Sequence, residues 1–186
     1  MGAIMRAHPK VFLMHRGEPF FTLARAICGQ QISVKAAQSV WDRLVVCCST
    51  IEPKAILLKK RTELRACGLS DRKVEYIADL AQHFADGRIH MDKWPAMDDE
   101  AIIAELTEVR GIGRWTAEMF LMFNLMRPDV FPLDDLGLQK GIRVAYFKGR
   151  KVSVRTMKRV GETWRPWRSV ATWYLWRSLD PVPVEY

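Results

Sequence analysis

Two adjacent carboxylates, Asp134 and Asp135, follow Pro132 and Leu133 and stand directly before a segment with helical periodicity. An aspartate without special surroundings is ionised at neutral pH, so it can stabilise developing positive charge or orient a water molecule. One aspartate is enough to cap the helix that follows. Two interpretations stay open: both carboxylates serve only the start of the helix, or one caps it while the other points into a cleft.

A second stretch with chemical potential contains Gly111 and Gly113, which separate two segments of helical periodicity. Glycine tolerates positive φ and lets the backbone approach a ligand closely. Free N–H groups at the start of a helix, together with the helix dipole, favour an anion. The alternative is an ordinary corner with a glycine C-cap. Because Arg110 and Arg114 flank the glycines, an anion-binding hairpin is the better interpretation.

The elements that must position these groups are predicted to be helices. Three groups of apolar residues recur at helical spacing: Ile102, Ile103, Leu106 and Val109; Ala117, Met119, Phe120, Met122, Phe123 and Leu125; and Leu138, Ile142 and Ala145. This spacing predicts one amphipathic helix before the glycines, one after them, and one after the aspartates. Asp98 is expected to cap the first of the three.

The rest of the chain also predicts helices, over residues 19–29, from Ser33 to about Cys47, in two short turns within 53–66, and from Ser70 to Gly87. Ser33 and Ser70 are expected to be N-caps.

A tryptophan-rich helix is predicted over 164–176, with Trp164, Trp167 and Trp173 in the core. No period-two alternation appears, so no strand is expected. The predicted fold class is all-α, with two helical lobes and a central cleft in a single domain over 1–186.

The charge balance favours nucleic acid as the partner. The chain has 29 lysines and arginines against 21 aspartates and glutamates, a net charge of +8. The most basic stretch carries no acid between its cations, which are Lys148, Arg150, Lys151, Arg155, Lys158 and Arg159. This stretch either binds successive phosphates of a nucleic acid or is ordinary solvated surface, and the second interpretation is slightly favoured.

The four cysteines, Cys28, Cys47, Cys48 and Cys67, form no CxxC pair and have no histidine cluster beside them. A zinc site is therefore not expected. The cysteines are expected to be core thiols of a protein in a reducing compartment. The sequence shows neither a signal peptide nor a run of eighteen apolar residues, so no membrane partner is expected.

Five motifs in order resemble the helix-hairpin-helix DNA glycosylase superfamily, and within it the 3-methyladenine DNA glycosylase II branch. They are I-C-G-Q-Q-I-S (27–33), G-L-S-D-R-K-V-E-Y-I (68–77), V-R-G-I-G-R-W-T-A-E-M (109–119), V-F-P-L-D-D-L-G-L-Q-K-G (130–141) and W-R-P-W-R-S-V-A-T-W-Y-L-W (164–176). The classical bacterial members of this branch carry an extra N-terminal β-rich domain. The chain is expected to be a compact form without it.

The resemblance implies a role for Asp135 as the catalytic aspartate, while Asp134 is expected to cap the helix or support the loop beside the base pocket. Trp176 matches a position that lines this pocket. Trp115 is a second pocket candidate, with a place in the core equally open. The resemblance and the hairpin chemistry together give the expected DNA-binding residues, which are Gln30, Gln31, Arg110, Gly111, Gly113, Arg114 and Thr116. Among these, Gln31 matches the residue that inserts into the stack where the target base leaves.

The implied activity is hydrolysis of the N-glycosidic bond of an alkylated purine, with double-stranded DNA as partner. Branches that also cut the backbone use a lysine at the position of Trp115, so a monofunctional enzyme is expected. Met119 and Leu136 stand where some members have tyrosines, which leaves the substrate range open. The remaining alternatives are a glycosylase for uracil or an oxidised base, and a DNA-structure-binding protein without catalysis.

No cofactor is expected. The iron–sulfur motif of some family members needs four C-terminal cysteines, and the last third of this chain has none. The hairpin carbonyls allow a monovalent cation, Na⁺ or K⁺. A monomer is expected, in the cytoplasm beside the nucleoid of a prokaryote or in the nucleus of a eukaryote.

Overall fold

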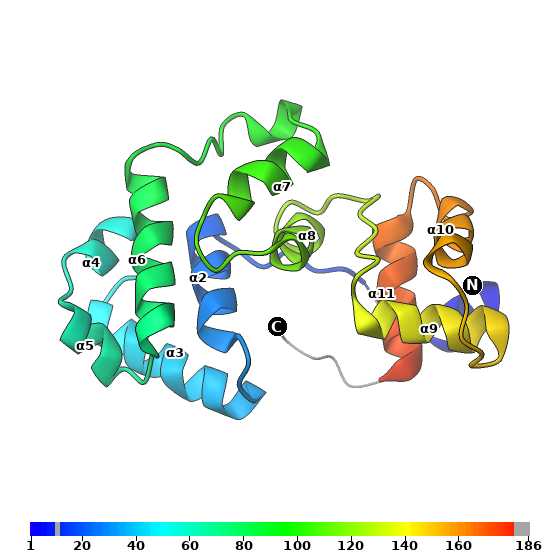
Figure 1. Ribbon diagram of the computed structural model, residues 1–186, viewed down its shortest axis with the longest axis horizontal. Helices are drawn as coiled ribbons and strands as arrows, with labels where there is room; N and C mark the ends of the chain where they lie inside the picture. Colours follow the sequence, from blue (N-terminus) through cyan, green and yellow to red (C-terminus); the bar gives the residue numbers. More distant parts are fainter. Residues whose placement is uncertain (10–11, 181–186) are drawn as a thin grey trace. The chain divides into compact units, whose positions relative to one another are not determined.

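A computed structural model describes residues 1–9 and 12–180 (Figure 1). Helices form all of the regular structure in these ranges, which confirms the all-α prediction. They are α1 (Gly2–Ala7), α2 (Pro19–Gly29), α3 (Val34–Cys48), α4 (Pro53–Leu57), α5 (Arg61–Ala66), α6 (Asp71–Ala85), the short 3₁₀ helix η1 (Trp94–Ala96), α7 (Asp99–Thr107), α8 (Arg114–Phe123), α9 (Leu136–Phe147), α10 (Val154–Glu162) and α11 (Arg168–Leu179).

The chain divides into two compact units. Of the described residues, the first unit contains 1–9, 12–15 and 118–180, and the second contains 16–117. Helix α8 begins in the second unit and continues in the first. None of the helices in the described ranges is long and apolar enough to cross a bilayer.

The second unit is built around α6, which packs against α2 and α4 (Figure 1). Its apolar face follows from helical spacing, because Ile77 and Leu80 are fully buried along with Leu23 and Ile27 of α2. The N-caps predicted for α3, α6 and α7 are confirmed. Their side chains, from Ser33, Ser70 and Asp98, each accept a hydrogen bond from the backbone N–H three residues later.

The first unit is organised by the contact between α9 and α11, against which α1 and α10 also pack. Leu138 and Ile142 of α9 are fully buried in one cluster with Leu175 of α11. The two helices approach closely at Gly141, where a Cβ atom would lie 3.0 Å from the Cβ of Leu175. A larger residue at this position would therefore push α9 away from α11.

The last helix differs from the prediction, since α11 begins at Arg168 and not near residue 164. Pro166 lies between α10 and α11, and because proline has no N–H it cannot continue a helix from the preceding turn. Trp164 is buried as predicted and donates from its indole to Tyr146 Oη at 3.0 Å. Trp167 was placed in the core, and this was wrong: it stands at the N-cap of α11 and is 60% exposed.

Candidate active site

Asp135 is held at the start of α9 by two hydrogen bonds to one oxygen. Its Oδ1 accepts from the backbone N–H of Leu138 at 2.5 Å and from Trp176 Nε1 at 2.8 Å. The first bond makes Asp135 the N-cap of α9. The second comes from α11, so the position of the carboxylate depends on the packing of two helices. Both partners lie in the first unit.

Asp134 was expected to cap the helix or to support the loop. The capping role was wrong, because α9 begins at Leu136 and the N-cap position falls on Asp135. Asp134 is exposed and precedes the cap. The capping role and the proposed chemical role therefore belong to the same side chain.

Aromatic rings surround the Trp176 indole. Phe123, at the end of α8, lies nearly parallel to it at 6.3 Å between ring centroids. Trp173 contacts both rings edge-on, at 5.6 Å from Phe123 and 6.4 Å from Trp176. On Trp173 the guanidinium of Arg177 lies 4.4 Å from the ring centroid. Stacking of this kind fixes ring orientation, and with it the direction of the indole N–H toward Asp135.

The glycine after the aspartates is part of this geometry. A Cβ atom at Gly137 would lie 3.0 Å from Asp135 Oδ1 and 3.1 Å from Trp176 Nε1. These separations are tighter than ordinary contacts between a carbon and a polar atom, so a side chain here would displace one partner of the bond. Gly137 therefore gives the bond between Trp176 and Asp135 the space it needs.

The predicted hairpin lies in the second unit and rests on α6. Gly111 has φ +87°, and a Cβ atom there would come within 2.2 Å of the Tyr76 ring, so no other residue fits without a shift. The backbone N–H of Arg110 donates to Asp79 Oδ2 at 2.8 Å. The side chain of Gln30 donates from Nε2 to the Gly111 carbonyl at 2.9 Å. Contacts from two separate helical segments thus hold the hairpin.

The remaining DNA-binding candidates lie at the surface of this unit or near it. Gln31 is exposed and has φ +59°, a strained backbone conformation for a residue other than glycine. Arg114 forms a two-bond ion pair with Glu100, whose side chain is 70% exposed, so the pair is solvated and weak. Thr116 is half-buried. Their contacts with DNA stay predictions.

Trp115 is 37% exposed, so the core interpretation that was left open for it is not supported. It belongs to the second unit, as part of α8 before Glu118. Asp135 and Trp176 are brought together in the first unit. A shared base pocket with Trp115, and the central cleft, stay predictions. Met119 is buried and Leu136 is 76% exposed, so of these two substitutions for tyrosine only Met119 is packed inside the protein.

Several positioning residues were missed from the sequence. Tyr76 lies in one of the recognised motifs, but its contact with Gly111 spans 35 positions and no local pattern indicates it. Asp79 looks like an ordinary helix residue. Gly137 could have been recognised from the sequence. A glycine inside the first turn of a helix costs stability and usually has a packing or functional reason.

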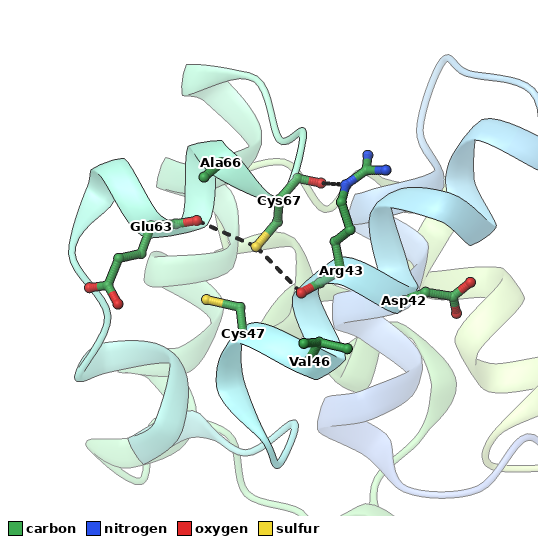
Figure 2. Close-up of a pocket in the computed structure, with 7 residues that line it drawn as sticks. All are labelled: Asp42, Arg43, Val46, Cys47, Glu63, Ala66 and Cys67. Atoms are coloured by element: carbon green, nitrogen blue, oxygen red, sulfur yellow. Dashed lines mark hydrogen bonds between the residues drawn. The ribbon is translucent and has the colours of Figure 1, made fainter.

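A hollow of about 470 Å³ elsewhere in the second unit lacks comparable chemistry (Figure 2). Its lining includes Cys67, whose thiol donates to the carbonyls of Glu63 and Arg43 at 3.4 and 3.6 Å. Burial raises the pKa of Cys67 to about 11. Since the thiolate is the nucleophile and is scarce at neutral pH with such a pKa, this hollow is not a convincing active site.

Comparison with known proteins places the chain in a family. The sequence profile of the HhH-GPD superfamily of base excision DNA repair proteins matches residues 24–166, and the chain belongs to this superfamily. It is 33% identical over 169 residues to DNA-3-methyladenine glycosylase 1 of Schizosaccharomyces pombe, covering 89% of this chain and 74% of that protein.

Two solved structures are similar over nearly the whole chain. The DNA-3-methyladenine glycosidase of Bacillus halodurans superposes with a TM-score of 0.87 at 34% identity, covering 91% of this chain and 79% of that one. The 3-methyladenine DNA glycosylase of Schizosaccharomyces pombe, solved in complex with abasic DNA, has a TM-score of 0.80 at 30% identity, covering 98% and 93%. The predicted branch of the superfamily is confirmed.

Proposed function

We propose that this protein is a monofunctional DNA glycosylase of base excision repair. It flips an alkylated purine such as 3-methyladenine out of the duplex and hydrolyses the N-glycosidic bond, leaving an abasic site. The observation that carries the proposal is the Asp135 carboxylate, held by the start of α9 and by Trp176. The relatives named for 3-methyladenine support the substrate, and the relative solved with abasic DNA supports the product.

The chemistry suits a single fixed carboxylate. Alkylation puts a positive charge on the purine, so the base leaves easily with the electron pair of the broken C1′–N bond. The sugar then develops oxocarbenium character, which a negative charge stabilises. Asp135 supplies this charge and orients the water whose oxygen bonds to C1′, while the proton of that water passes to the carboxylate or to solvent.

Trp176 has two roles in this proposal. Its indole N–H holds Asp135, and its ring presents a π-face to the flipped base. A cationic base on an aromatic face gains about 0.5–2 kcal/mol. A neutral purine gains less, which gives the pocket a preference for the charged lesion.

Duplex DNA is the partner in this proposal, and the protein acts on it as a monomer, in the nucleoid or the nucleus. The hairpin offers backbone N–H groups at the start of α8 to a phosphate. Gln31 enters the stack in place of the expelled base. A Na⁺ or K⁺ ion at the hairpin carbonyls would strengthen the same phosphate contact.

The decisive test is release of free methylated base from alkylated duplex DNA by the wild type and by Asp135→Asn. Asparagine is as good an N-cap as aspartate, and its amide oxygen can keep both observed bonds of Oδ1, so the variant removes charge and little else. We expect release to fall by about a hundredfold or more while duplex binding persists. Binding without release by the wild type would instead indicate a non-catalytic DNA-binding protein or another lesion.

The absence of lyase activity has its own test. The nucleophilic lysine of lyase branches would stand at Trp115, and tryptophan has no amine to form a Schiff base. Incubation with a lesion duplex and sodium borohydride is therefore expected to trap no covalent adduct. An adduct on gel electrophoresis would contradict this part of the proposal and would leave base release by Asp135 untouched.

A further inference from the structure

One strongly charged region is not used by the proposed chemistry. The segment from Lys148 to Arg159 holds six of the 29 lysines and arginines and none of the 21 acidic residues. These six cations, Lys148, Arg150, Lys151, Arg155, Lys158 and Arg159, are all exposed and are named here the α10 basic surface. They account for six of the eight excess positive charges of the chain.

The fold places three of these charges on one side of α10. Arg155, Lys158 and Arg159 recur at i, i+3 and i+4, so they share a face of the helix. The opposite face is buried through Met157 and Gly161. At Gly161 a Cβ atom would lie 2.6 Å from the Phe131 ring, so α10 is packed tightly and cannot easily turn its charged face inward.

Several arginines elsewhere in the protein are paired with carboxylates. Arg61 and Arg65 pair with Asp71, Arg114 with Glu100, and Arg168 with Asp129. In the described part of the chain, no carboxylate lies within ion-pair distance of any residue of the α10 basic surface. A solvated basic face normally alternates in sign, and this one does not.

We propose that the α10 basic surface binds the phosphate backbone of undamaged duplex DNA, adding a contact that does not depend on the lesion. Lysine and arginine side chains on phosphates give affinity without reading sequence. Ser153 and Thr156 lie between the cations, where Ser153 caps α10 and the two hydroxyls share a hydrogen bond at 3.0 Å. An acidic protein partner fits less well, because protein interfaces have an apolar core and Val154 is the single exposed apolar side chain among these twelve residues.

Such a surface serves the proposed function by keeping the enzyme on DNA between lesions. Counterion release makes this contact salt-dependent, with about 0.9 added to the slope of log K against log salt for each neutralised phosphate. The inference rests on a DNA partner, and its test does not require base release.

The experiment measures affinity of the full chain for an undamaged duplex over a range of salt concentrations. The variant R155Q/K158Q/R159Q is compared with the control R6Q/K54Q/K93Q, which removes three exposed charges outside this surface. We expect the first variant to bind about tenfold or more weakly than the control and to lower the slope by about 2 to 3. A second variant, K148Q/R150Q/K151Q, should show the same effect through the preceding loop.

If the variants and the control lose equal affinity for the duplex, the proposal is overturned, because the effect then comes from net charge alone. Unchanged affinity in both variants would overturn it as well. Circular dichroism and thermal melting check that the proteins are folded. The single-turnover rate of base release at saturating enzyme is expected to match that of the wild type. If the wild type binds duplex through this surface but releases no base, the proposed function fails and this inference stands.

Discussion

At the scale of the residue, the position of the Asp135 carboxylate depends on two other residues, Gly137 and Trp176. An alanine at 137 would crowd both atoms of the indole–carboxylate bond, since its Cβ would meet them at 3.0 and 3.1 Å. Gly137→Ala should reduce base release by about tenfold to a hundredfold, the cost of a small misplacement. Stability should not fall much, because alanine is favoured over glycine in a helix by about 0.5–1 kcal/mol. Single-turnover kinetics and thermal melting separate the two effects.

Trp176→Phe gives an independent check, because it removes the donor to Asp135 and keeps an aromatic ring. Both variants should lose rate and retain affinity for undamaged duplex. Full activity in both variants would show that the bond between Trp176 and Asp135 has no part in catalysis.

The residues of this site were only partly predictable. The resemblance singled out Asp135 and Trp176, because each lies in a family motif, and their roles stay predictions. Their hydrogen bond was not predicted, since it joins residues 41 positions apart and depends on how α9 meets α11. Asp134 was expected to cap the helix or to support the loop, because sequence alone leaves the first residue of a helix uncertain by one or two positions.

At the scale of the element, α6 is the support of the hairpin. Asp79 accepts from the Arg110 N–H, and Tyr76 fills the space that a side chain at Gly111 would need. Asp79→Ala leaves that N–H without this acceptor and should cost about 1–2 kcal/mol of stability. The phosphate contact proposed for the hairpin needs a fixed backbone, so we expect weaker binding to lesion duplex and an unchanged rate of base release at saturating enzyme.

A matched control for this prediction is Asp42→Ala, which removes one exposed carboxylate from α3 in the same unit. The comparison is a binding titration of the two variants against the same duplex. Equal affinities of the two variants would show that the hydrogen bond to Asp79 does not affect DNA binding by the hairpin.

The starts of α3, α6 and α7 were predictable from the sequence, whereas those of α9 and α11 were not. Ser33, Ser70 and Asp98 cap their helices as expected, because capping is a local hydrogen bond. The region from Trp164 to Trp167 was wrongly included in a helix. Its aromatic spacing imitates a helical face, and the influence of Pro166 outweighs that pattern.

At the scale of the whole molecule, carboxylates with lowered pKa values make stability depend on acidity. Burial acts to raise the pKa of Asp129, but hydrogen bonds and charge from Arg168, with Arg165, outweigh it and lower the pKa. Arg114 lowers the pKa of Glu100, and Arg61 with Arg65 lowers that of Asp71. A lowered folded-state pKa gives stability that is present above the unfolded value, near 3.9 for aspartate, and is lost as the pH falls below it.

We therefore expect the free energy of unfolding to decline as the pH falls below about 4. Asp129 should dominate, because the Arg168 side chain facing it is only 14% exposed. Asp129→Asn should lower stability by about 1–3 kcal/mol at neutral pH, and the gap to the wild type should narrow in acid. Urea unfolding at a series of pH values tests this. A difference in the free energy of unfolding between Asp129→Asn and the wild type that stays constant with pH would contradict this prediction.

The all-α architecture and the family were predictable from the sequence, because helical periodicity and five ordered motifs extend over most of the chain. The role of the basic stretch was left open between phosphate binding and solvated surface. The sequence cannot decide between them, because which carboxylates lie close to these cations in space is a property of the fold.

The capping bond of Asp135 also has an evolutionary consequence. Under the proposed mechanism, selection for a folded protein and selection for repair act on the same side chain, so a lineage that loses the need for the activity still keeps a hydrogen-bond acceptor at this position. Serine, threonine and asparagine satisfy the fold alone, whereas aspartate satisfies both demands. Inactive descendants of this protein would therefore retain a polar residue at 135 and their overall shape, and the lost charge would be the mark of their changed role.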